Sequence, residues 1–144
     1  MRLDRERILA YLSELVDALE DWERYRTGTT REQLVSNRDA RNMVLHAMLV
    51  AIQAAIDIGQ HVLVANRWER PGSYRETFEL LGAHGVIPQE LGEQMERLAG
   101  FRNAPVHVYW RPDFDAVHRI LQEGCNPLRA FCRVVKQLLE IEEK

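Results

Sequence analysis

The segment from Arg102 to Tyr109 gathers three kinds of reactive side chain within eight residues. Arg102 supplies a permanent positive charge, His107 a titratable imidazole and Tyr109 a phenol. An imidazole with an ordinary pKa of about 6.5 can take or give a proton near neutral pH, and a guanidinium can hold an anionic group through charge-assisted hydrogen bonds. These residue types indicate acid–base and electrostatic chemistry centred on this segment.

The spacing within the segment limits how these side chains can meet. On a straight helix His107 lies about 140° round from Arg102 and roughly 7.5 Å further along the axis, whereas Tyr109 lies within about 20° of Arg102. One straight helix therefore cannot aim Arg102 and His107 at the same atom. Either Pro105 bends the helix, because it lacks the N–H that would bond to the Phe101 carbonyl, or two copies of the segment meet across a symmetric dimer. We favour the dimer, with Pro105 shaping a local bend.

A structural interpretation of the same residues stays open on spacing alone. Arg102 could form a salt bridge, His107 could be a hydrogen-bonded core histidine, and Tyr109 could pack its ring with a hydrated hydroxyl. This interpretation predicts that each of the three can be replaced without loss of function, which separates it from a catalytic one.

The elements that must position this segment are helices. Apolar residues recur every three or four positions from Leu3 onward, and no segment alternates convincingly with period two. The length of 144 residues, with 46% apolar and 28% charged residues, is typical of one globular domain. We predict an all-α fold in which residues 1–144 form a single up-and-down helical bundle of five to six helices, associated as a homodimer.

Capping residues and prolines predict the helix boundaries. The first helix should end near Tyr25, and the second should run from a Thr30 capping box to about Ala65. The fourth helix, which we expect to start at Pro88, should continue its apolar stripe through Arg102 to Tyr109. Further helix starts are expected at Ser73, Pro88, Asp113 and Asn126, the last as a cap followed by a first-turn proline.

The long second helix has two different sides. Its apolar side includes Gly59, which we expect to permit close approach of a neighbouring helix. Its polar side carries His46, Gln53, Asp57, Gln60 and His61. We interpret this polar stripe as a solvated face; in the alternative it lines a cleft, and Asp57 orients Arg102 or His107.

Composition and charge exclude several classes of protein. The N-terminal residues lack the apolar stretch of a signal peptide, and no unbroken run of about 18 apolar residues could span a membrane, so we expect a cytoplasmic protein without membrane contact. A net charge of -3 argues against a broadly positive surface that binds any nucleic acid. Nucleic acid could still be handled at one local site.

Two other sets of residues have structural explanations. Cys125 and Cys132 would stand about 10 Å apart along one helix, too far for a disulfide, so we expect small core residues. Asp113, Asp115 and His118 include metal-ligand types, but an N-cap explains Asp113 and a favourable first-turn charge explains Asp115. We therefore expect neither a metal site nor a cofactor.

The pattern Arg-x-x-x-x-His-x-Tyr, met by Arg102, His107 and Tyr109, resembles the signature of the HEPN superfamily, and Asn103 fits it as well. Within that superfamily the chain is most similar to the HepT-like group, the toxin half of type VII (HEPN/MNT) toxin–antitoxin pairs. The similarity extends over roughly residues 35 to 125, and it includes the segments 54–61, 73–81, 85–88 and 100–103.

This resemblance implies a metal-independent endoribonuclease. His107 would take the proton from a ribose 2'-hydroxyl or give one to the leaving oxygen, and Arg102 would stabilise the extra charge on phosphorus. A homodimer would bring two histidines and two arginines into one cleft. Asn103 is implied as an orienting or substrate-binding residue, although an amide that merely caps local backbone is an equal alternative.

The resemblance also implies a protein partner. In the HepT-like group a minimal nucleotidyltransferase antitoxin (MntA-like) transfers AMP from ATP to the motif tyrosine, here Tyr109. Bulky phosphate groups beside Arg102 would block RNA both sterically and electrostatically. AMPylation of Tyr109 would therefore neutralise the toxin.

One departure from the group keeps a second function open. Ala104-Pro105 stands where the group usually has bulky apolar residues, and this change could alter the orientation of His107. The alternative is a noncatalytic HEPN module that binds a nucleotidyltransferase or a nucleotide without cutting RNA. A plain structural helical dimer is the third interpretation.

Overall fold

The computed structural model describes residues 2–102 and 113–143, and this part of the chain contains seven helices and no strand. The predicted all-α fold is confirmed, with more helices than the expected five to six. The helices are α1 (Arg5–Gly28), α2 (Arg31–Ser36), α3 (Arg38–Ala65), α4 (Tyr74–Ala83), α5 (Gln89–Arg102), α7 (Phe114–Glu123) and α8 (Cys125–Glu143).

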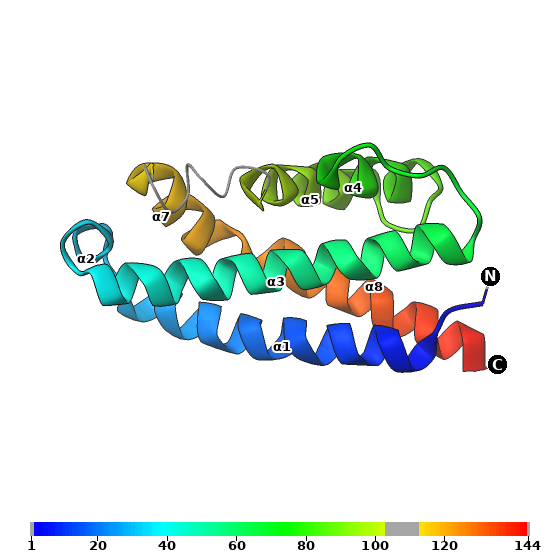
Figure 1. The fold of residues 1–144 in the computed structure, drawn as a ribbon, viewed down its shortest axis with the longest axis horizontal. Coiled ribbons are helices and arrows are strands. Elements are labelled where there is room, and N and C mark those ends of the chain that lie inside the picture. The colour runs from blue at the N-terminus through cyan, green and yellow to red at the C-terminus, as the bar shows by residue number, and fades with distance from the viewer. Residues whose placement is uncertain (1, 103–112, 144) are drawn as a thin grey trace.

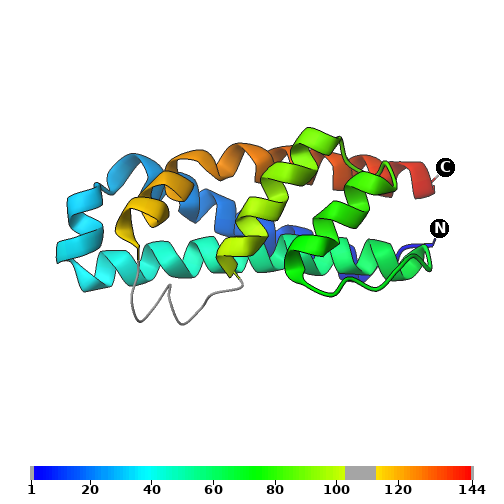
Figure 2. The same ribbon diagram turned by 90° about the horizontal axis from the view of Figure 1, so that it is seen from above.

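The helices form two layers. The long helices α1, α3 and α8 run along the long axis of the molecule, and α4, α5 and α7 lie over one side of them (Figure 1). Seen from above, α4 and α5 cross α3 obliquely, and both ends of the chain lie at the same end of the bundle (Figure 2). Since α3 contacts each of the other described helices, it is the central element of the fold.

The prediction of one uninterrupted helix from Thr30 to Ala65 is wrong at a single residue. Asn37 is extended (φ -113°, ψ 102°) and separates α2 from α3. Its side chain accepts a hydrogen bond from the Ala40 N–H at 3.1 Å, so Asn37 acts as the N-cap of α3. The predicted capping box of Thr30 and Gln33 is present at the start of α2.

Other boundaries differ by a few residues. Helix α1 continues three residues beyond Tyr25 to Gly28. The last helix begins at Cys125, so Asn126 is not its cap, although Pro127 does lie in its first turn. Asp113 caps α7 as predicted, because its side chain accepts from the Ala116 N–H at 3.1 Å.

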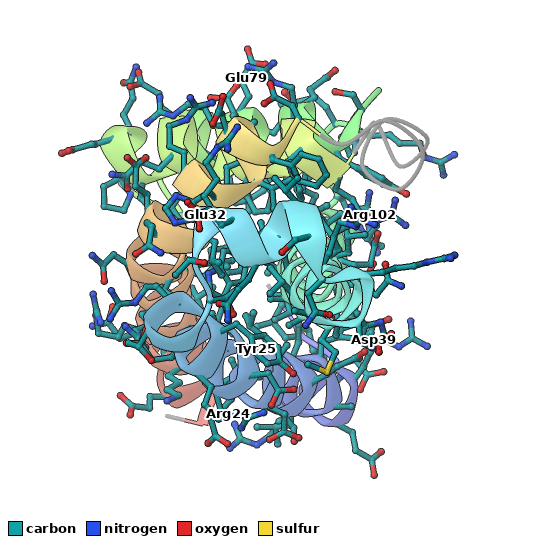
Figure 3. The ribbon with its side chains drawn as sticks, turned by 90° about the vertical axis from the view of Figure 1, so that its left-hand side faces the viewer. Arg24, Tyr25, Glu32, Asp39, Glu79 and Arg102 are labelled. Carbon is teal, nitrogen blue, oxygen red and sulfur yellow. The ribbon has the colours of Figure 1, made fainter. Side chains whose placement is uncertain are left out.

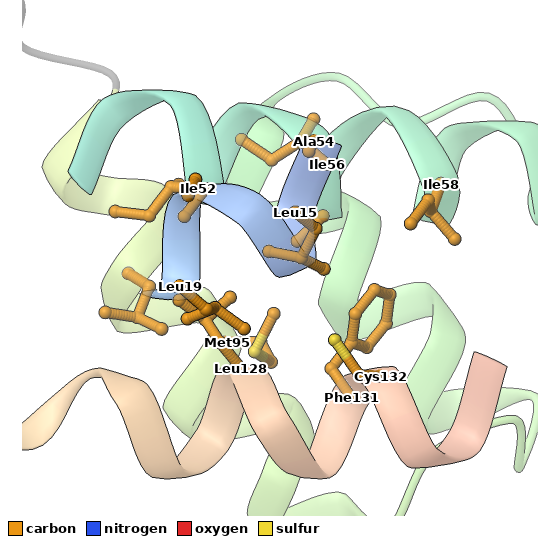
Figure 4. Packing of buried hydrophobic residues seen from close by; sticks show 14 of the residues in the cluster. Leu15, Leu19, Ile52, Ala54, Ile56, Ile58, Met95, Leu128, Phe131 and Cys132 are labelled. Atoms are coloured by element: carbon orange, nitrogen blue, oxygen red, sulfur yellow. The ribbon is translucent and has the colours of Figure 1, made fainter. Parts of the chain in front are cut away.

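The core lies where apolar side chains of the two layers meet. Leucine, isoleucine, methionine and phenylalanine side chains from α1, α3, α5 and α8 converge there (Figure 4). The fully buried Trp22 donates a hydrogen bond from its indole N–H to the Leu121 carbonyl at 2.8 Å. Because a Cβ on Gly124 would lie 2.5 Å from the Trp22 ring, only glycine fits between α7 and α8.

Helix α4 approaches α3 closely at the glycine predicted for that role. A Cβ on Gly59 would lie 2.9 Å from Thr77 Cγ2 and 3.2 Å from Leu81 Cδ1. The prediction that Gly59 permits close helix packing is confirmed. This contact fixes the upper layer against the part of α3 that lies next to Asp57.

Among the described residues, α3 is long and apolar enough to cross a membrane, with a mean hydropathy of 1.6 over its most apolar window. However, 61% of this 18-residue stretch is buried inside the bundle. The core helix of a soluble protein can be equally long and apolar. The polar residues His46, Gln53 and Asp57 interrupt the apolar sequence of this continuous helix, which is why the sequence holds no unbroken apolar run. We therefore interpret α3 as the core helix of the bundle.

Candidate active site

Arg102 ends the buried stripe of α5. Leu91, Met95, Leu98 and Ala99 of this helix are buried, and Arg102 continues the same side as a half-buried residue. Figure 3 shows its side chain at the outer edge of the molecule, between α3 and the layer above it. The last turn of α5 therefore directs a cation toward the polar side of α3.

A chain of two hydrogen bonds holds this cation. Arg102 Nε donates to Gln53 Oε1 at 3.1 Å, and Gln53 Nε2 donates to Asp57 Oδ1 at 2.9 Å. Gln53 and Asp57 lie four residues apart, so their side chains are neighbours on the surface of α3. Because the Gln53 amide donates to Asp57 through its nitrogen, its oxygen is left to accept from Arg102.

The two bonds form one wall of a pocket of about 290 Å³ between three helices. Arg102 comes from α5, Glu14 from α1, and the remaining lining residues from α3: Leu49, Val50, Gln53, Ala54 and Asp57. The pocket thus combines an apolar floor with one guanidinium and two carboxylates. The described part of the chain has larger pockets elsewhere, but they do not contain the motif arginine, so volume alone does not select the site.

The polar stripe of α3 is divided between different roles. Gln53 accepts a hydrogen bond from Arg102, and Asp57 accepts one from Gln53. His46, in contrast, is exposed to solvent. His61 Nε2 accepts a hydrogen bond from the Asp4 backbone N–H at 3.0 Å, and so ties the start of α1 to α3. The interpretation of the stripe as a solvated face is therefore wrong for Gln53, Asp57 and His61, which are half-buried and hydrogen-bonded.

The remaining motif residues, Asn103, His107 and Tyr109, and also Pro105, lie outside the described residues. Asp115, outside the motif, pairs with Arg31 of α2. Of the residues predicted to form the site, the structure brings Arg102 and Asp57 together, with Gln53 between them.

Gln53 is the residue that sequence reasoning passed over. It lies 49 positions before Arg102, and a glutamine on the polar side of a helix is usually a solvated residue. The available signal was its spacing of four residues from Asp57, which predicts contact between those two side chains but says nothing about Arg102.

The cysteines lie away from this pocket and are poor nucleophiles. Both are free and buried, as predicted for core residues. Burial raises the pKa of the Cys125 thiol to about 11 and raises that of Cys132 as well, so both stay protonated at neutral pH.

The family model described as Ribonuclease HepT-like matches residues 15–135 of the chain. Since this match covers most of its length, the chain belongs to the ribonuclease HepT-like family. The resemblance predicted from Arg102, His107 and Tyr109 is therefore confirmed at the level of the family.

Curated relatives carry ribonuclease names. The mRNA nuclease HepT of Shewanella oneidensis is 31% identical over 84 residues, which is 58% of this chain and 63% of that protein. The putative RNase of Archaeoglobus fulgidus is 31% identical over 137 residues, covering 94% of this chain and 96% of that one. The chain thus spans less than two thirds of the Shewanella relative but nearly the whole archaeal one.

Solved structures share the fold at lower identity. The tri-AMPylated Shewanella oneidensis HEPN toxin in complex with MNT antitoxin has a TM-score of 0.80 at 22% identity, and the match covers 91% of this chain and 97% of the toxin. The cytosolic protein YutE of Bacillus subtilis has a TM-score of 0.82 at 19% identity, covering 97% of this chain and 93% of YutE. These similarities confirm the predicted HEPN-like bundle.

Proposed function

We propose that this chain is the toxin of a type VII (HEPN/MNT) toxin–antitoxin pair and cleaves RNA as a metal-independent endoribonuclease in the cytoplasm. Membership of the ribonuclease HepT-like family supports the reaction, and the names of the Shewanella and Archaeoglobus relatives agree with it. The MNT antitoxin bound to the structurally similar Shewanella toxin supports the pairing.

The observation that carries this proposal is the guanidinium of Arg102 at the edge of the α3 pocket. It is held through Nε alone, and Nη1 and Nη2 make no hydrogen bond or ion pair within the described part of the chain. The Nη1–Nη2 edge, which has no partner among the described residues, matches two oxygens of a phosphate group. A preorganised cation of this kind stabilises charge as it develops on a phosphoryl group.

The proposed reaction needs one base and one acid. His107 takes the proton from a ribose 2'-hydroxyl, the 2'-oxygen forms a bond to phosphorus, and the bond from phosphorus to the 5'-oxygen breaks. A second imidazole, His107 of the partner subunit, gives a proton to that leaving oxygen. The products are a 2',3'-cyclic phosphate and a 5'-hydroxyl, and Arg102 stabilises the charge on phosphorus throughout. Asn103 orients the substrate beside it.

The surface of α3 supports a homodimer that brings two such pockets together. Met43, Val50, Asp57 and Val64 follow one another at seven-residue intervals, so they lie on one side of the helix. Met43 is 51% exposed and Val64 is 74% exposed, on either side of the Asp57 pocket. A symmetric contact along this side would bury the two apolar side chains and place both Arg102 residues at one interface.

The antitoxin partner is a minimal nucleotidyltransferase that transfers AMP from ATP to the hydroxyl oxygen of Tyr109 and releases pyrophosphate. The tri-AMPylated state of the structurally similar Shewanella toxin supports this chemistry. Phosphates attached to Tyr109 would compete with RNA for Arg102, because both present anionic oxygens.

The second candidate is a noncatalytic HEPN module that binds the nucleotidyltransferase and serves as its substrate. The Ala104-Pro105 departure favours it, since these residues lie between Arg102 and His107. Under this proposal the wild-type protein has no nuclease activity, so His107→Ala leaves partner binding intact and is as inactive on RNA as wild type.

Cleavage of total cellular RNA tests the two candidates. Purified unmodified protein, His107→Ala and Tyr109→Phe are incubated with RNA in EDTA, and folding and dimerisation are checked for each. We expect cleavage by wild type and Tyr109→Phe only, with 2',3'-cyclic phosphate ends. Equal inactivity of folded wild type and His107→Ala would favour the noncatalytic module.

A further inference from the structure

The contact between Arg102 and α3 has an unusual composition for an arginine site beside a carboxylate. Asp57 does not form an ion pair with Arg102; the neutral Gln53 amide lies between them. A direct pair would occupy the guanidinium edges with carboxylate oxygens and compensate its charge. The intervening amide holds the guanidinium at Nε and leaves Nη1 and Nη2 without an ion-pair partner among the described residues.

The direction of the two hydrogen bonds indicates that Asp57 influences Arg102 through Gln53. A glutamine amide presents an oxygen and a nitrogen of similar size, so its orientation is set by its partners. The carboxylate of Asp57 accepts from Gln53 Nε2 at 2.9 Å, and a flipped amide would face that carboxylate with its oxygen. Asp57 therefore selects the orientation in which Gln53 Oε1 accepts from Arg102 Nε.

We propose that Gln53 is the positioning residue of the site: its amide, oriented by Asp57, holds Arg102 by Nε and keeps both Nη groups available for a phosphate oxygen. The consequence for RNA rests on the proposed ribonuclease function, whereas the positioning of Arg102 does not. Gln53 touches no reacting atom in this scheme and acts only through Arg102.

Glutamate is the variant that separates this role from simple structural support. Gln53→Glu keeps the length of the side chain and still accepts from Arg102 Nε. It also places a second carboxylate beside Asp57 and neutralises the guanidinium directly. If Gln53 only supported Arg102 structurally, glutamate would hold Arg102 as well or better, because a hydrogen bond between charged groups is stronger.

Gln60 provides a matched control on the same side of α3. It lies seven residues after Gln53, is also half-buried, and is not among the residues that line the Arg102 pocket. Gln60→Ala and Gln60→Glu therefore repeat the changes in helix propensity and in net charge without touching the site.

The first measurement is the Nε–H resonance of Arg102 in the ¹⁵N NMR spectrum of the full chain, assigned by its loss in Arg102→Lys. We expect Gln53→Ala to shift this resonance and to speed its exchange with water, whereas Gln60→Ala leaves it unchanged. An unchanged resonance in Gln53→Ala would overturn the positioning role, whether or not the protein cuts RNA.

The second measurement is kcat/KM on RNA together with Kd for a 2'-O-methyl RNA that cannot be cleaved. We expect Gln53→Ala to lower kcat/KM by about tenfold, the scale of a lost hydrogen bond to a charged group, and Gln53→Glu to lower it further and weaken RNA binding. Both Gln60 variants should stay within about twofold of wild type. Wild-type activity in Gln53→Glu would overturn the proposal.

A third measurement shows whether Gln53 acts through Arg102. In Arg102→Lys the guanidinium Nε–H is gone, so adding Gln53→Ala should cost no further activity. Equal losses in both backgrounds, with unchanged melting temperatures, would overturn the proposal. If folded wild type cuts no RNA at all, the ribonuclease function fails, and the NMR result alone decides the role of Gln53.

Discussion

Two arginine sites of this molecule differ in the partner that holds the guanidinium. Within the described part of the chain, Arg102 is held by the neutral amide of Gln53, with a single hydrogen bond at Nε. Arg26 of α1 is held by the carboxylate of Glu23, with Nε at 2.9 Å and Nη2 on the second oxygen. Arg129 of α8 adds a further bond to Glu23 at 3.1 Å. Among the described residues, the partner of the first guanidinium is a neutral amide, whereas the partner of the second is a carboxylate.

The electrostatic consequences differ in the same direction. Hydrogen bonding to Arg26, followed by that to Arg129, lowers the pKa of Glu23 to about 2, so this carboxylate stays ionised and links α1 to α8. At Arg102 the carboxylate of Asp57 is bound to Gln53 instead, and Arg102 makes no ion pair within the described part of the chain. We expect Arg26 to serve packing and the amide-held Arg102 to bind a further anion.

Arg102→Ala should produce the largest effect of any change at either site. We expect kcat/KM on RNA to fall by about 10²- to 10³-fold, the scale seen when a group that stabilises transition-state charge is removed. The melting temperature should change little, because Arg102 is half-buried and its hydrogen-bond partner among the described residues is a neutral amide. RNA cleavage and thermal melting measure the two effects.

Arg26→Ala is the matched control, and it should give the opposite result. RNA cleavage should stay at the wild-type level, and the melting temperature should fall slightly because Glu23 loses its bidentate partner. A loss of cleavage in Arg26→Ala with normal folding would break the distinction between the two sites.

Much of the fold was predictable because local signals specify it. The Thr30 capping box, the Asp113 cap and the close approach at Gly59 follow from residue types within a few positions of each feature. The interruption at Asn37 was missed because apolar periodicity continues across it, and a single extended residue does not break that pattern. Asn37 is nevertheless a favoured N-cap residue type.

The site was predictable only in part. Arg102 was found through the spacing of its own motif, and Asp57 was one of several polar residues on a helix side. The hydrogen bond from Arg102 to Gln53 depends on how α5 crosses α3, which packing of the whole bundle decides. No periodicity within either helix contains that information.

Asp57→Ala and Asp57→Asn sharpen the comparison at intermediate magnitude. Alanine releases the Gln53 amide, so we expect kcat/KM to fall about fivefold. Asparagine keeps an oxygen that can accept from Gln53 Nε2, but its own amide N–H can also donate to a flipped Gln53, so we expect a loss smaller than that in alanine. A loss in asparagine equal to that in alanine would mean that the charge of Asp57, and not its hydrogen bond to Gln53, supports Arg102.

Glu23→Gln should give the smallest effect, and one that depends on pH. The pKa of Glu23 lies at about 2 in the folded protein against an ordinary value of 4.5, so its ionised form favours folding above pH 4.5. That contribution declines as pH falls from 4.5 toward 2 and is absent below. Because Glu23 pairs at the surface, the melting temperature of Glu23→Gln should be lower than that of wild type by on the order of 1 °C at pH 7.

The difference in melting temperature should shrink toward zero as the pH approaches 2, and RNA cleavage at pH 7 should be unchanged. A pH-independent difference in melting temperature would mean that Glu23 stabilises the bundle by packing, and the contrast with the amide-held Arg102 would then lose its electrostatic basis.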